Sequence, residues 1–214
     1  MRTTDIIIII NQEISFYKRQ IKENLGFVSQ YERYVNNNED YIKENPDKEE
    51  EFFREAYYNF HSYFPYLVNN SLLVAFDSYL EYKLQLIFKE FCIEKEKKKN
   101  ISCIDYYFNN IYLNYKINLT EINNDLGLIK DLHKVRNRIV HENSSLSKKY
   151  QPSIIEIRKA VNSETYRVLR KYKSDIEYNE ITTRFFITNT HLLIRYLDSI
   201  EEILSHILQK INKN

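Results

Sequence analysis

The sequence predicts an all-α fold, a bundle of long helices. Only two glycines and three prolines occur among 214 residues, too few for the many tight turns of a β-sandwich or barrel. Apolar residues instead recur at steps of three and four, the spacing that places them on one face of a helix. No cluster of glycines could cradle a phosphate or a dinucleotide, which excludes the nucleotide-binding folds built on such loops. At 43% hydrophobic residues the chain is rich enough to bury a core.

The first part of the chain predicts helices that precede the bundle. Residues 5–44 contain no proline and show apolar side chains at helical steps, and a second helix is expected to begin at Asp47, just after a proline. We therefore expect residues 1–60 to form an N-terminal helical extension. Residues 61–214 are expected to form the helical bundle itself.

The rest of the chain predicts five helical stretches. The first is apolar on most sides, as expected for the central helix of a bundle, and the last carries an apolar stripe along one side. In order, the expected stretches are Leu67–Ile93, Ile104–Tyr115, about Thr120–Asn143, Ser153–Lys173 and Thr182–Ile211.

Signals for a membrane or a metal are missing from the sequence. The apolar run Ile6–Ile10 is far shorter than the roughly 20 residues that span a bilayer, so we expect a cytoplasmic protein with no membrane contact. Cys92 and Cys103 form no C-x-x-C pair, and no histidine lies beside them at a ligand spacing. We expect two reduced cysteines, no metal site and no cofactor.

The stretch KVRNRIVHEN, residues 134 to 143, lies on the third of these helices. On a helical wheel, at about 100° per residue, four apolar side chains fall within roughly 60° of one another and define a core stripe: Leu128, Leu132, Val135 and Ile139. His141 lies about 160° from the centre of that stripe, with Asn137 one turn earlier on nearly the same line. Arg136 lies on the flank between the core and the polar face. His141 is therefore expected to be exposed, in a functional site or on an ordinary polar face.

The charge of the chain is segregated around this stretch. From Lys130 to Lys173 there are twelve basic and four acidic residues, a net charge of +8 in a chain whose net charge is +1. Such a basic segment favours a polyanion, and Tyr166 and Tyr172 could stack on unpaired bases. An ordinary solvated basic face is the alternative. The residues we expect to contact RNA are Lys134, Arg138, Arg167, Arg170 and Lys171.

Three residues of the stretch resemble a family motif. Arg136, Asn137 and His141 fit the R-N-x-x-x-H motif of HEPN-domain proteins, small helical bundles that include many metal-independent ribonucleases of toxin–antitoxin, abortive-infection and CRISPR systems. The segment LLVAFDSYLEYKLQLIF looks like the family's earlier core helix, and the final helix is suitably placed. The resemblance covers roughly Tyr66 to Ile211.

The resemblance implies a helical bundle of the HEPN type, an endoribonuclease activity without cofactor, and a homodimer whose two motif helices face each other. In the family an acidic residue of the earlier helix often supports the site, which makes Asp77 the matching candidate, with Glu81 next. The family also implies a possible antitoxin or regulatory partner. In one subset a tyrosine two positions after the histidine is modified by a nucleotidyltransferase partner; Asn143 stands there, so regulation by that partner is not expected.

The three motif residues suit cleavage of RNA by its own 2′-hydroxyl group. Histidine is the side chain whose ordinary pKa lies near neutral pH, so His141 is of the type that could move a proton in either direction. Arg136 is always charged and could stabilise the phosphorane, while Asn137 could orient the imidazole or hold the phosphate. The other four histidines, including His133 on the same helix, are interpreted as structural.

Two functions therefore stay open. The first is a HEPN-type toxin or defence endoribonuclease that cleaves tRNA or other cellular RNA. The second is a non-catalytic helical module that binds RNA or a protein partner with the same basic face.

Overall fold

The structure, a computed structural model, describes residues 3–24, 27–92, 103–117, 119–149 and 151–213. Helices make up most of this part of the chain, and the only regular sheet within it is one two-stranded hairpin, which confirms the predicted all-α class. None of the described helices is both long and apolar enough to cross a membrane.

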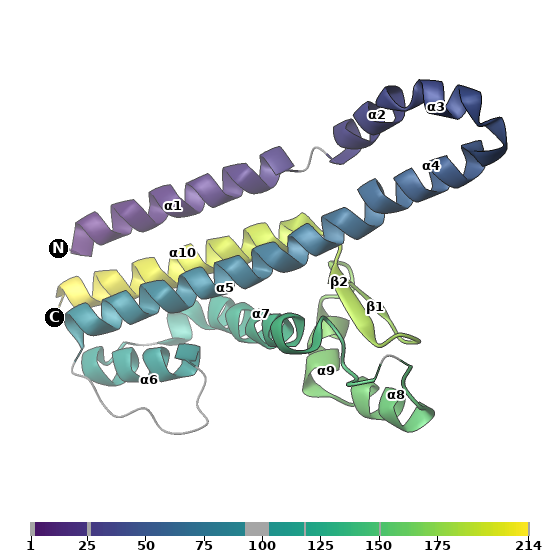
Figure 1. Ribbon diagram of the computed structural model, residues 1–214. Helices are drawn as coiled ribbons and strands as arrows, with labels where there is room; N and C mark the ends of the chain where they lie inside the picture. Colours follow the sequence, from purple (N-terminus) through teal and green to yellow (C-terminus); the bar gives the residue numbers. More distant parts are fainter. Residues whose placement is uncertain (1–2, 25–26, 93–102, 118, 150, 214) are drawn as a thin grey trace.

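Three long helices lie side by side: α1 (Thr3–Asn24), α5 (Phe64–Phe91) and α10 (Thr190–Lys213) (Figure 1). Helix α1 runs antiparallel to α10, since the Thr3 hydroxyl near the start of α1 donates a hydrogen bond of 2.9 Å to the side chain of Asn212 near the end of α10. Both chain termini therefore lie at the same end of the bundle.

The expected N-terminal extension divides into two parts. Helix α1 belongs to the bundle, because Ile10, Ile14 and Ile21 are at most 1% exposed and share one core with α5 and α10. The three following helices instead form an arm that projects beyond the end of the bundle (Figure 1). They are α2 (Phe27–Asn37), α3 (Glu39–Glu44) and α4 (Glu49–Tyr58), with a 3-10 turn, Pro46–Lys48, before α4.

The arm joins α5 without a sharp break. A π-helical turn, Asn59–Tyr63, connects α4 to α5, and Pro65 occupies the first turn of α5. Pro65 has no N–H to donate to the preceding turn, and the π-helical turn lies directly before it, so the regular α-helical pattern changes at this point while the chain stays helical on both sides. The break that this proline suggests is therefore only a change of helix type.

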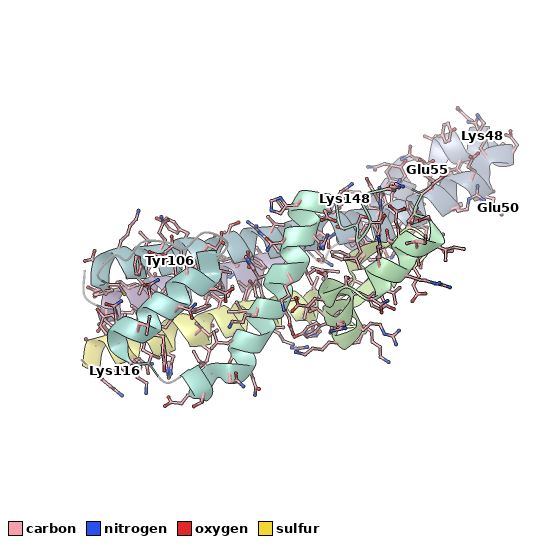
Figure 2. The ribbon with its side chains drawn as sticks, turned by 90° about the horizontal axis from the view of Figure 1, so that it is seen from below. Lys48, Glu50, Glu55, Tyr106, Lys116 and Lys148 are labelled. Atoms are coloured by element: carbon pink, nitrogen blue, oxygen red, sulfur yellow. The ribbon has the colours of Figure 1, made fainter. Side chains whose placement is uncertain are left out.

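Helix α7 (Asn123–Glu142) crosses α5 and α10 on the side of the bundle away from α1 (Figures 1 and 2). Leu128, Leu132 and Val135 are at most 7% exposed, and Ile139 packs partly against the same core, so the predicted apolar stripe is confirmed. A 3-10 turn (Leu119–Ile122) leads into α7, and α6 (Cys103–Tyr115) packs against α5.

The stretch expected as one helix from Ser153 to Lys173 is two helices, α8 (Ile154–Val161) and α9 (Glu164–Lys171). The serine before each helix caps it by accepting a hydrogen bond from a backbone N–H of the first turn. The second cap, Ser163, begins a new helix in mid-stretch, which the apolar spacing alone did not reveal.

The helix expected from Thr182 is wrong over its first residues, because Arg184–Ile187 form a strand, β2. This strand pairs with β1 (Ile176–Asn179) in a β-hairpin. In β2, Phe185 and Ile187 are buried while Arg184 and Phe186 are half-buried, an alternation of period two. The aromatic and β-branched residues of this segment favour a strand, and α10 begins only at Thr190.

A buried asparagine ties the hairpin and the end of α7 to α5. Asn70 is 5% exposed; its side-chain oxygen accepts the N–H of Ile187 at 3.2 Å, and its amide donates to the hydroxyl of Ser144 at 2.9 Å. Ser144 has a left-handed backbone, with φ of 62°, as does Asn143 at 49°. These bonds hold the chain that leaves α7 in a fixed conformation.

Replacing Asn70 with Ala should lower the free energy of unfolding by about 2–3 kcal/mol, because two hydrogen bonds are lost and the N–H of Ile187 is left buried. Urea unfolding measures the change. Ser71→Ala is the matched control on the same helix, since Ser71 is exposed and its hydroxyl donates to the carbonyl of Leu67 of its own helix. Equal effects of the two substitutions would contradict the proposed tie.

Candidate active site

The centre of the site is Asp77, a carboxylate of α5 with no exposed surface. The hydroxyl of Tyr196, from α10, donates to its Oδ1 at 2.7 Å. The Nδ1 atom of His133, from α7, lies 3.0 Å from Oδ2 and 3.2 Å from Oδ1. The Nε atom of Arg136, one turn further along α7, lies 3.3 Å from Oδ2. Three helices therefore meet at one buried negative charge.

The surrounding groups are protonated in the way that this charge requires. Burial raises the pKa of Tyr196 well above its ordinary value, and the charge of Asp77 adds to the effect, so Tyr196 keeps its proton and donates it. Burial alone lowers the pKa of His133, but the hydrogen bond and charge of Asp77, with the charge of Glu81, raise it above the ordinary 6.5. The charged imidazole is therefore favoured beside Asp77.

Arg136 is anchored at one edge of its guanidinium group. Its side chain is 17% exposed, and the Nε–H does not point along the contact with Asp77, which makes this contact an ion pair rather than a hydrogen bond. One terminal nitrogen, Nη1, donates to the side-chain oxygen of Asn137 at 3.0 Å. The structure thus joins Arg136, Asn137 and Asp77, three of the residues selected from the sequence, in one chain of contacts.

His141 lies apart from this chain of contacts. It is exposed in the last turn of α7, as the helical wheel predicts, and within the described residues no hydrogen bond or ion pair holds its ring. Asn143 then ends the helix in a left-handed conformation, its N–H bonded to the carbonyl of Arg138. Within one subunit the anchored arginine and the exposed histidine therefore sit on the same helix without touching.

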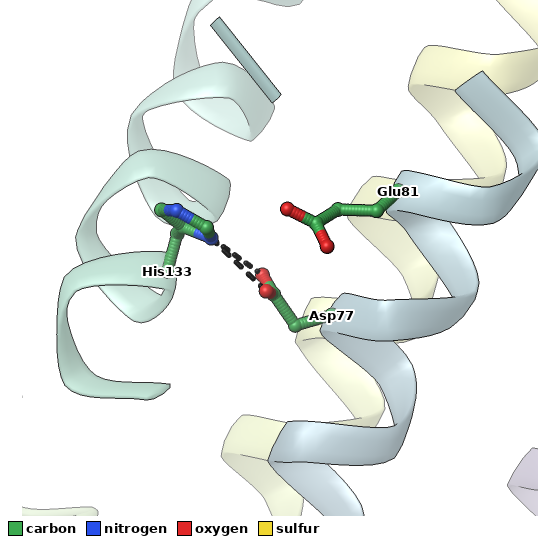
Figure 3. A group of neighbouring side chains, drawn as sticks. All are labelled: Asp77, Glu81 and His133. Carbon is green, nitrogen blue, oxygen red and sulfur yellow. Dashed lines mark hydrogen bonds and ion pairs between the residues drawn. The ribbon is translucent and has the colours of Figure 1, made fainter. Parts of the chain in front are cut away.

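Three side chains lie close enough together to raise the question of a metal ion. The ligand atoms of Asp77, Glu81 and His133 lie within 4.8 Å of one another (Figure 3). Asp77 already has donors on both oxygens, however, and the guanidinium group of Arg136 stands where it would repel a cation. A metal ion would also have to displace the proton that His133 favours. We therefore assign the group to an ion-pair network.

The acidic residues of the basic segment form ion pairs with basic residues of the same segment. Each of the four acidic residues pairs with one base of the same segment: Lys134–Glu164 at 2.6 Å, Lys171–Asp131 at 2.7 Å, Lys149–Glu156 at 3.7 Å, and Arg138–Glu142. The first two pairs hold α9 along the side of α7 that carries residues 131 and 134. About two turns further on, that side leads towards His141.

The residues expected to contact RNA differ in how they are held. Lys134, Arg138 and Lys171 are engaged in the ion pairs just described. Arg167 and Arg170 are exposed on α9, beside the same face of α7. These two exposed arginines therefore lie on the helix that the ion pairs hold beside residues 131 and 134 of the motif helix.

His133 is the residue of the site that the sequence interpretation missed. The sequence predicts a structural histidine there, yet His133 makes the closest contact of α7 with Asp77. One signal could have identified it: it precedes Arg136 by three residues, so both side chains lie on one flank of the helix and can reach the same carboxylate.

Comparison of the chain with protein-family models, with characterised proteins and with solved structures finds no match.

The contact between His133 and Asp77 makes stability depend on pH. Because the pKa of His133 is raised in the folded state, its stabilising effect is complete below the ordinary value of 6.5 and is lost as the pH rises through the raised pKa. We expect the difference in unfolding free energy between wild type and His133→Gln to shrink as the pH rises through that window, measured by urea unfolding. The exposed His191→Gln, which leaves the contact between His133 and Asp77 intact, is the control. A difference for His133→Gln that is the same at every pH would contradict the assignment.

Proposed function

We propose that this chain is a metal-independent endoribonuclease of the HEPN type, a toxin or defence effector that acts on tRNA or other cellular RNA. One observation carries the proposal: Arg136 is held by a buried carboxylate from another helix while His141, on the same helix and within the basic segment, stays exposed. A purely structural arginine would not need an exposed histidine at the family spacing. An antitoxin or regulatory partner belongs to the same proposal.

The reaction begins with attack of the RNA 2′-oxygen on the adjacent phosphorus. As the new O–P bond forms, one imidazole accepts the proton of the 2′-hydroxyl. As the bond from phosphorus to the 5′-oxygen breaks, a protonated imidazole donates a proton to that leaving oxygen. The products are a 2′,3′-cyclic phosphate and a 5′-hydroxyl, and His141 suits both proton transfers.

Arg136 stabilises the negative charge that builds on the phosphorane. Its Nε edge faces Asp77 and its Nη1 reaches Asn137, so the guanidinium group is oriented before the substrate arrives. Such preorganised donors are worth most in the transition state, because no reorganisation is needed during the reaction. Asn137 then holds the arginine in position.

The chemistry calls for a second copy of the chain. One subunit supplies only one His141, and within it Arg136 and His141 do not touch. A two-fold axis beside the exposed end of α7 would bring two of each residue into one cleft, and two-fold dimers are the commonest oligomers. We therefore propose a homodimer with a composite site.

The purified chain should cleave RNA in the presence of a chelator and leave 2′,3′-cyclic phosphate ends. His141→Ala and Arg136→Ala should each lower the rate by at least about a hundredfold, the usual contribution of a general acid or base or of a charge-stabilising group. Sequencing of cleavage ends from total RNA measures both the activity and the substrate.

The exposed His191→Ala is the matched control and should cleave like wild type. Cleavage abolished by chelation, or retained in His141→Ala, would overturn the proposal. RNA binding without cleavage would favour the second function, the non-catalytic module.

The composite site predicts rescue between inactive subunits. Light scattering at micromolar concentration should give about twice the 26.1 kDa of one chain. Mixing His141→Ala with Arg136→Ala subunits should give a hybrid that cleaves RNA faster than either parent, because one intact copy of each residue enters the shared cleft. A monomer with full activity would refute the composite site.

A further inference from the structure

His133 shares a buried carboxylate with the arginine of the proposed site. Its Nδ1 lies 3.0 Å from Oδ2 of Asp77, the same oxygen that Nε of Arg136 approaches at 3.3 Å. The two basic groups come from one flank of α7, one turn apart, and the carboxylate between them has no exposed surface. Whatever charge His133 carries is therefore felt by Arg136 through a single shared counter-ion.

The balance of charge depends on His133. Arg136 carries one positive charge and faces two negative charges nearby, those of Asp77 and Glu81. With a neutral imidazole this group has a net charge of −1, and with an imidazolium it is neutral. A phosphate would be repelled in the first case and accepted more readily in the second, because the interior screens these charges weakly.

We propose that His133 is a positioning residue that acts through Asp77: as an imidazolium it neutralises this carboxylate and leaves the charge of Arg136 available to an RNA phosphate. The use of Arg136 on RNA rests on the proposed function. The coupling between His133, Asp77 and Arg136 does not, since it follows from the distances alone.

Groups from α5, α10 and α7 face His133, and most of them favour its charged form. Helix α5 presents Asp77 and Glu81, which favour the imidazolium, and α10 presents Tyr196, which keeps its proton and donates to Asp77. On α7 itself Arg136 opposes the imidazolium. Helix α9 meets α7 through Asp131 and Lys134, on a different side of the helix from His133.

The coupling can be measured without any ligand by following the ring of His133 in nuclear magnetic resonance titrations. Asp77→Asn should lower the pKa of His133, because the charge that most strongly opposes the effect of burial is lost, and Arg136→Gln should raise it, because a neighbouring positive charge is removed. His133→Gln identifies the signal by its loss. A pKa of His133 that is unmoved by both substitutions would overturn the proposal, since the three groups would then not be coupled electrostatically.

The use of Arg136 is measured by binding of a short 2′-O-methyl oligouridine, which cannot be cleaved for want of a free 2′-hydroxyl. A His141→Ala background removes the other histidine of the proposed site. In this background affinity should fall as the pH rises from about 6 to about 8. His133→Gln keeps a hydrogen-bond donor to Asp77 but no charge; it should bind about tenfold more weakly at about pH 6 and lose the pH dependence. His133→Lys, charged throughout, should restore the affinity at both pH values.

The two measurements separate this proposal from the proposed function. If His133→Gln binds the oligonucleotide with the wild-type pH dependence, or if His133→Lys fails to restore affinity in a chain that folds, the positioning role is overturned. If no variant, wild type included, binds the oligonucleotide, the proposed function falls, and the role of His133 towards RNA falls with it. If binding behaves as expected but no RNA is cleaved, the positioning role stands and the catalytic function does not.

Discussion

The fold depends on one buried carboxylate that three helices satisfy together. A charge without exposed surface costs several kcal/mol unless it is paired and hydrogen-bonded. Asp77 of α5 meets this requirement only when Tyr196 of α10 and the basic flank of α7 are in place. A slip of α7 by one residue would move His133 and Arg136 away and leave the carboxylate of Asp77 without its basic partners. The polar network therefore specifies one alignment of helices that apolar packing alone would define less strictly.

The same constraint separates the two ends of the motif. Arg136 is drawn towards Asp77 on the inner flank, while His141, five residues later, lies on the outer face. The end of α7 is nevertheless well fixed, because Asn70 binds Ser144, and the backbone of Leu146 bonds to Thr183 beside the hairpin. An exposed histidine on a rigid support can meet a partner surface without a large loss of conformational freedom. This is the property that a site shared between subunits requires.

Much of this architecture could be predicted from the sequence, because it rests on local spacing. The apolar steps of three and four located the long helices, and the wheel placed His141 outside and Arg136 on the flank. Local spacing does not predict the structure where a residue is held by a partner that is distant in the sequence. The strand at Phe185 is set by pairing with β1 and by Asn69 and Asn70 of α5, about 115 residues earlier. A second case is His133, since a helical wheel gives the direction of a side chain but not the residue that it contacts.

The distribution of charge indicates where a polyanion would approach the protein. The arm and the π-helical turn that follows it, residues 27–63, carry nine acidic and four basic residues. Helix α3 of the arm has no buried residue. The four acids of the basic segment are each paired with one of its own bases. Two more of its bases pair with acids of other helices, Arg136 with Asp77 and Lys130 with Asp105, so the excess positive charge there is only partly neutralised. A nearly neutral chain thus presents two regions of opposite sign, and a field of this kind steers a charged ligand before contact. Under the proposed function an RNA strand is repelled by the arm and attracted to α8, α9 and the end of α7. It thereby arrives at the one helix that carries both Arg136 and His141.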